Sequence, residues 1–218
     1  MKNKEVFQLL IQEYPIKDCI FTKGFNMIIT IGREYGSGGH EIGERLADKY
    51  QIPFFDKAAL VKAAKEKGFY DKIISFYDEK PVNSLLYAIA MNSYSENIGR
   101  LQFDLIRSIS EKKDFVMIGR CGNYIFKEEK EMVSVFIHSD IQKRIQRVRE
   151  VYGIEEKNMK TYIERIDKQR ASFHKFYTDQ EWGDSRNYHL SIDSGEIGID
   201  ACTHLISEFI ENRKGYLR

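Results

Sequence analysis

A glycine-rich turn follows a short apolar segment and precedes a helical pattern. Residues 32–41 read GREYGSGGHE and contain Gly36, Gly38 and Gly39. Glycine lets the backbone turn tightly and point its N–H groups inward, and the N-terminus of the following helix adds partial positive charge. Together these features form a cradle for phosphate. We therefore predict that a nucleotide phosphate is bound by Gly36, Ser37, Gly38, Gly39, His40 and Glu41.

The turn departs from the standard phosphate-binding loop, G-x-x-x-x-G-K-[ST], because no register supplies the lysine. If His40 takes the lysine position, Glu34 falls where the first glycine belongs, and if Gly39 takes it, Arg33 falls there. The cation that normally reaches the β- and γ-phosphates must then come from elsewhere. Arg33 directly follows the apolar segment, and arginine binds phosphate oxygens strongly at two points, so we predict a catalytic role for Arg33.

Two other interpretations of the turn stay open. One is a plain tight turn between a strand and a helix. The other is a dinucleotide-binding turn, whose G-x-G-x-x-G pattern would need glycine at position 41, where Glu41 stands. Asp56, 20 residues after Gly36, nevertheless lies at the end of a predicted strand, where a ribose-binding acid would be expected.

From Met27 onward, apolar strand patterns alternate with helical patterns, which predicts a parallel sheet covered by helices on both faces. We therefore expect an α/β fold, a three-layer sandwich around a central parallel sheet of about five strands. Its predicted strands lie at 27–31, 52–55, 115–118, 132–137 and 189–192. Helices are predicted at 41–50, over most of 57–112 with a break near Pro81, after the fourth strand, and at 197–212.

The predicted domain covers residues 27–218, and residues 1–26 are an N-terminal extension of uncertain order. In open α/β sheets, ligands bind outside the carboxyl ends of the strands. In this chain those ends fall at 32–40, 56–57, 119–123 and 138–144. The polar residues there are therefore the candidates for chemistry.

Composition narrows the function classes. The chain has 218 residues and a net charge of +1, so a global field for nucleic acid is not implied. Its three cysteines lie far apart and form no CxxC pair, which argues against a zinc site and favours a reducing, cytoplasmic location. No apolar run approaches 18 residues, so we expect no membrane span. The sequence does not determine an oligomeric state.

The chain resembles the cytidylate kinase-like family over about residues 27–212. The specific motif is the run from Ile31 to Gly39 followed by Ile42-Gly43. Three further stretches support it, namely Phe54-Phe55-Asp56-Lys57, Gly119-Arg120 and Arg165-x-Asp167-x-x-Arg170. The resemblance implies a phosphate loop, a monophosphate-binding insert at about 57–112 and a basic lid at about 140–180. Residues 140–176 carry ten Lys or Arg and six Asp or Glu.

The implied activity is ATP-dependent phosphoryl transfer, with Mg²⁺, to a nucleoside monophosphate, foremost CMP or dCMP. Nucleotides are then the only expected partners, without nucleic acid or membrane. On this resemblance Arg144, Arg165 and Arg170 join Arg33 as catalytic residues. Asp56, Lys57 and Arg120 are the substrate-binding residues, and no resident metal site is expected beyond the Mg²⁺ that accompanies ATP.

Two departures from cytidylate kinases keep other functions open. Cys121 follows Arg120 where those enzymes have Arg-Asp, and Ala58 stands in a segment where they have Asp-Thr-Gly. A kinase of another small molecule is one alternative, and a non-catalytic nucleotide sensor is another because the loop lysine is absent. For the charged residues 140–176, the alternative to a functional lid is a helix face exposed to solvent, because most runs of charged residues lie on such faces.

Overall fold

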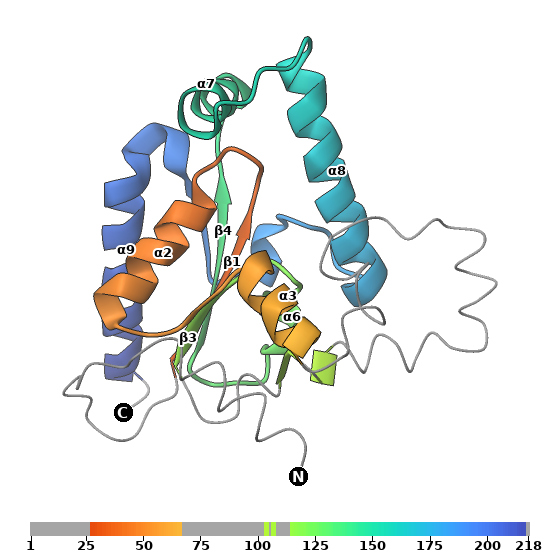
Figure 1. Ribbon diagram of the computed structural model, residues 1–218. Helices are drawn as coiled ribbons and strands as arrows, with labels where there is room; N and C mark the ends of the chain where they lie inside the picture. The colour runs from red at the N-terminus through yellow and green to blue at the C-terminus, as the bar shows by residue number, and fades with distance from the viewer. Residues whose placement is uncertain (1–26, 67–102, 105, 108–113, 217–218) are drawn as a thin grey trace, which may run out of the picture.

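The computed structural model describes residues 27–66, 103–104, 106–107 and 114–216 (Figure 1). The predicted extension at 1–26, the break near Pro81 and most of the predicted insert lie outside the described residues. Within the described ranges, no helix has both the length and the apolar character needed to cross a membrane.

Five parallel strands form one sheet in the order β2-β3-β1-β4-β5. The central strand β1 (Ile28–Arg33) lies between β3 (Phe115–Ile118) and β4 (Met132–His138). The edges are β2 (Phe54–Phe55) and β5 (Leu190–Asp193). β3 is buried along its whole length, β4 over nearly all of its length, and β1 up to Ile31, which suits their apolar sequences because both faces are covered. The expected α/β fold with a parallel five-stranded sheet is confirmed.

Helices cover both faces of the sheet (Figure 1). α2 (Gly39–Tyr50) and α9 (Ser194–Tyr216) lie side by side on one face, where Ile42, Leu46 and Ile206 pack against the strands. On the other face, α3 (Lys57–Glu66), α6 (Gly122–Ile125) and the C-terminal part of α8 (Met159–Thr178) share a second apolar cluster with the sheet. The result is the three-layer arrangement that the strand–helix alternation predicts.

The two helices that follow β4 in the chain both begin beyond the carboxyl ends of the strands (Figure 1). α7 (Ile141–Tyr152) follows β4 directly, and Asp140 caps its N-terminus by accepting a bond from the backbone N–H of Gln142. α7 then connects through residues 153–158 to the long α8, which runs back along the molecule. A short 3₁₀ helix, Ser185–Asn187, precedes β5. The predicted lid segment therefore consists mainly of two helices.

Several predicted boundaries shift for local reasons. α2 begins at Gly39 rather than at 41, because Gly38 adopts a left-handed conformation with φ 79° and starts the helix. β2 contains only two of the four predicted residues, and β5 begins and ends one residue later than predicted. α9 extends beyond the predicted 197–212 at both ends, although Gly198 has a non-helical φ of 81°. The predicted order of the elements that fall in the described ranges is correct.

Candidate active site

The glycine-rich turn joins the carboxyl end of β1 to the N-terminus of α2. Gly36 and Gly38 have φ values of 82° and 79°, which side chains other than glycine rarely adopt. A Cβ at position 38 would also lie 2.2 Å from the Ile199 side chain of α9. No side chain caps α2, so the first N–H groups of the helix have no partner within it. The turn thus has the geometry of an anion cradle.

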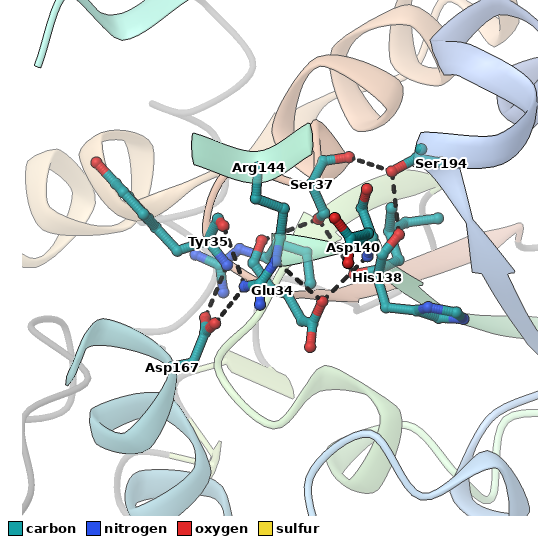
Figure 2. A network of polar contacts seen from close by, with 12 residues as sticks. Glu34, Tyr35, Ser37, His138, Asp140, Arg144, Asp167 and Ser194 are labelled. Carbon is teal, nitrogen blue, oxygen red and sulfur yellow. Dashed lines mark hydrogen bonds and ion pairs between the residues drawn. The ribbon is translucent and has the colours of Figure 1, made fainter. Parts of the chain in front are cut away.

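Hydroxyl groups fix the turn to the neighbouring strands. The buried Ser37 hydroxyl lies 2.9 Å from the carbonyl oxygen of Glu34 and 3.1 Å from that of Ile137. Ser194, at the start of α9, donates to the Ser37 carbonyl at 2.6 Å and lies 3.1 Å from the His138 carbonyl (Figure 2). The Ser37 side chain, predicted to contact the nucleotide, is therefore engaged inside the protein. Its backbone remains part of the turn.

A buried ion-pair network connects the glycine-rich turn to α7 and α8 (Figure 2). Arg144 of α7 is only 7% exposed. Its guanidinium bonds to Asp167 of α8 at 2.5 Å, approaches the Glu34 carboxylate at 3.4 Å and donates to the Tyr35 carbonyl at 3.3 Å. Asp167 in turn accepts a 2.7 Å bond from the backbone N–H of Tyr35. Arg144, predicted as a catalytic residue, thus connects α7, α8 and the turn.

The larger pocket lies over the glycine-rich turn and has a volume of about 540 Å³. Its cationic side chains are Arg33 from β1, Arg147 from α7 and Arg170 from α8. Arg144 does not line this pocket. Acidic and apolar side chains complete the walls, among them Glu34, Glu41, Glu44, Val151, Tyr152 and Ile154. Three arginines beside a phosphate-binding turn make this pocket suitable for a polyphosphate.

Arg147 is the cationic residue of the larger pocket that the sequence analysis does not predict. Its guanidinium bonds to the Glu41 carboxylate, and its Nε lies 3.3 Å from the Cβ position of Gly38. The available signal was helical spacing, because residues three apart share a helix face and Arg147 follows Arg144 by three. Which of the two faces the pocket depends on how α7 packs, which the spacing alone does not determine.

A second, small pocket of about 20 Å³ lies at the carboxyl ends of β1 and β3. Arg33 and Arg170 line it as well as the larger pocket, and Arg120 is a third arginine, only 2% exposed. Aromatic and polar side chains close it, including His174, Phe173, Trp182, Tyr188 and Asn123. Its volume is close to that of one water molecule, so only a compact group fits. Its charge favours an anion.

The backbone that presents Arg120 is unusual. Gly119, Arg120 and Cys121 have successive φ values of 70°, 55° and 57°, all in the left-handed region. For a non-glycine residue this conformation costs on the order of 1 kcal/mol or more, and such residues cluster at functional sites. The strained turn directs Arg120 into the small pocket rather than along the strand.

The remaining predicted site residues lie apart from the small pocket. Asp56 follows β2, caps α3 by accepting a 2.9 Å bond from the N–H of Ala59, and lies 3.3 Å from Nε2 of His40. Lys57 is the exposed first residue of α3. Arg165 is exposed, lies over the Tyr162 ring at 5.6 Å and lines neither pocket, whereas Arg170 lines both.

The His40–Asp56 contact joins α2 to the β2–α3 connection and carries a pH dependence. The hydrogen bond that His40 donates to the Asp56 carboxylate raises the pKa of His40, and the same bond lowers the pKa of Asp56. A raised histidine pKa means that its stabilisation is fully present below the unfolded pKa near 6.5. That stabilisation is lost as the pH rises through the folded value.

We therefore expect His40→Ala to destabilise the protein more at pH 5.5 than at pH 9. Both side chains are partly exposed, so the difference should be less than about 1 kcal/mol, or roughly 2–4 °C in melting temperature. Thermal melts of parent and variant at the two pH values measure it. His40→Gln, which keeps polar groups but does not titrate, should show the same difference between the two pH values, because that difference comes from the histidine of the parent. An equal effect of His40→Ala at both pH values would contradict the assignment.

Fold and site together define a class of protein. A glycine-rich turn after the central strand of a parallel sheet, with helices on both faces of that sheet, defines a kinase-like α/β fold. The model of the cytidylate kinase-like family matches residues 28–196, and the chain belongs to that family.

Solved structures agree with the fold. An uncharacterized protein from Eubacterium ventriosum is 32% identical, with a TM-score of 0.67, over 85% of this chain and 99% of that one. Shikimate kinase from Acinetobacter baumannii, in complex with shikimate, has a TM-score of 0.51 at 13% identity, over 88% and 96% of the two chains. A gluconokinase from Sinorhizobium meliloti has a TM-score of 0.51 at 14% identity, over 90% and 100%. At such low identities the two kinases are evidence for the fold alone. No curated protein matched the chain significantly.

Proposed function

We propose that this protein transfers the γ-phosphoryl group of ATP to a small anionic acceptor, foremost a nucleoside monophosphate such as CMP or dCMP. The observation that carries the proposal is that Arg33 and Arg170 line both pockets. One pocket lies over a phosphate-binding turn, and the other is a compact cationic pocket at the strand ends. Two arginines that border both pockets are placed to neutralise charge between a donor and an acceptor.

In this mechanism the turn and the arginines position groups and neutralise charge, because phosphoryl transfer requires little covalent chemistry of the protein. Backbone N–H groups at residues 36–41 bind the phosphates of ATP. Arg33, Arg147 and Arg170 stabilise the charge that spreads over the transferred group. An acceptor oxygen forms the new bond to the γ-phosphorus while the bond to the β–γ bridging oxygen breaks, and ADP leaves.

The residues of the larger pocket also suit a magnesium ion. Mg²⁺ is usually bound through one or two carboxylates together with substrate phosphates. Glu41, in the first turn of α2, is one of three carboxylates on the pocket wall and would hold the ion, directly or through water, in exchange for part of its pairing with Arg45 and Arg147. The ion would neutralise part of the phosphate charge. Among the described residues no group of three or more His, Cys, Asp and Glu is placed to hold a metal alone.

The anionic group of the acceptor is assigned to the small pocket, and the remainder of the acceptor to the end of β2. Arg120 binds its anionic group, since a planar guanidinium matches phosphate geometry. Asp56 has a lowered pKa because of its bond to His40, so it is charged at neutral pH and accepts bonds from an amine or hydroxyl. Lys57 adds positive charge beside it. Arg144 is assigned a positioning role, and the catalytic role of Arg165 stays a prediction.

A coupled assay with ATP, Mg²⁺ and individual acceptors tests the proposal. CMP, dCMP and other nucleoside monophosphates form one group, and gluconate and shikimate form a second. Turnover in the first group supports the nucleotide assignment, and turnover only in the second supports a kinase of another small molecule. The second group is included because Cys121 and Ala58 depart from the pattern of cytidylate kinases. ATP binding by calorimetry without transfer to any acceptor would indicate a nucleotide sensor instead.

We expect Arg120→Ala to raise the KM for the acceptor by about tenfold or more, because a hydrogen bond to a charged group contributes roughly 1.5–3 kcal/mol. The KM for ATP should change much less, because Arg120 lines the small pocket and not the larger one. Initial rates at varied acceptor and ATP concentrations separate the two effects. Arg186→Ala, which removes an exposed arginine paired with Asp184, is the matched control. Equal increases in both KM values would contradict the acceptor assignment.

A further inference from the structure

Positions 33 and 39 lie too close together for both to carry a side chain. A Cβ placed on Gly39 would lie 2.5 Å from Cβ and 3.1 Å from Cγ of Arg33. Real Cβ atoms essentially never approach another heavy atom within 3.0 Å. The Cβ of Arg33 is fixed by the backbone of β1, so a rotamer change does not move it away. Only a shift of α2 relative to β1 would make room.

The packing of β1 and α2 opposes such a shift. The backbone N–H of Glu34 bonds to the Ile137 carbonyl of β4 at 3.0 Å, which holds the end of β1. On the α2 side, a Cβ at Gly43 would lie 2.6 Å from the Ile118 side chain, so the helix lies directly on the sheet. Cores packed this closely do not absorb an added group without strain.

This steric exclusion distinguishes the two registers of the phosphate-loop motif. With the lysine position at 39, the first glycine of the motif falls at 33, and these are the two positions that exclude each other. In the standard motif, the position that corresponds to 33 is glycine and the position that corresponds to 39 is lysine. In this chain, position 33 is arginine and position 39 is glycine. The other register would place the cation of the motif at His40. The ring of His40, however, bonds to Asp56 and lies edge-on to Phe54.

We propose that this chain has exchanged the two side chains of the motif, so that Arg33 on β1 supplies the cation that a lysine on α2 would otherwise supply. The inference rests on the proposed function and extends it to a specific pair of positions. Arg33 lines the larger pocket beside the turn, where that cation is needed. A guanidinium there offers several donors, in a planar fork, to phosphate oxygens.

Four variants test the exchange: Gly39→Lys, Arg33→Gly, the double variant with both changes, and Arg33→Ala combined with Gly39→Lys. Melting temperature without ligand measures the steric conflict, and calorimetry with ATP and Mg²⁺ measures phosphate binding. Gly39→Lys alone should lower the melting temperature, and Arg33→Gly should weaken ATP binding about tenfold or more. The Arg33→Gly/Gly39→Lys variant should regain most of the melting temperature and most of the ATP affinity of the parent.

The Arg33→Ala/Gly39→Lys variant is the matched control, because alanine keeps the Cβ that lies 2.5 Å from the new side chain. It should not regain the melting temperature. The inference is overturned if Gly39→Lys melts like the parent, or if the folded Arg33→Gly/Gly39→Lys variant binds ATP no better than Arg33→Gly. If the parent binds no ATP, the proposed function fails together with the phosphate role of Arg33. If the parent binds and transfers but the variants do not follow this pattern, the exchange alone fails.

Discussion

Arg33→Ala is expected to leave the fold intact and to reduce phosphoryl transfer by a factor on the order of 10² or more. That is the effect of losing one preorganised charge-stabilising group at a reacting centre. Arg33 is the strand-derived arginine that borders both pockets, in a loop that lacks the usual lysine. Steady-state rates at saturating ATP, measured well below the melting temperature, give the effect on kcat.

Arg149→Ala serves as the charge-matched control for this prediction. Arg149 lies on α7, is largely exposed and pairs with Glu155 at 3.3 Å, so its removal should leave the rate within a few-fold. A structural role for Arg33 predicts the opposite pattern. In that case Arg33→Ala would lower the melting temperature while transfer stayed within a few-fold of the parent, and the missing charge would have to come from Arg147 or Arg170.

Arg144→Ala is expected to destabilise the protein by about 3–5 kcal/mol, because removing one partner of a buried ion pair leaves the other charge uncompensated. Asp167 and Glu34 would be the charges left behind, and Tyr35 would lose part of its support. In a chain of this size the loss corresponds to roughly 6–20 °C in melting temperature. Denaturant unfolding of parent and variant measures it.

A double-mutant cycle with Asp167→Ala separates this network from a direct catalytic contact. If the two side chains stabilise the protein through each other, the double variant should lose less than the sum of the single losses, with a coupling of about 0.5–3 kcal/mol. Arg144→Ala should also weaken ATP binding, because the network holds the turn that contacts phosphate. A stability change within about 0.5 kcal/mol, together with a large loss of kcat, would place Arg144 in direct contact with substrate instead.

The sequence alone was sufficient for the architecture. Apolar runs ending at Gly32 and Gly119, alternating with helical patterns, predicted the parallel sheet, because strand and helix periodicities are local properties of the chain. The glycines of the turn were equally informative, because residues other than glycine rarely adopt the positive φ values found at Gly36 and Gly38. The ends of elements were less predictable, as at β2, because they depend on hydrogen bonds to neighbouring strands.

Tertiary structure decided which of the charged residues meet. The sequence placed Arg144, Arg165 and Arg170 near the site, but the faces of α7 and α8 that turn inward depend on how both helices pack. Packing buries Arg144 against the turn and places Arg147 and Arg170 in the larger pocket. It leaves Arg165 exposed. Likewise, the exclusion between Arg33 and Gly39 arises only where β1 and α2 come together. Distances between side chains on different elements follow from packing across the core, which no local pattern in the chain specifies.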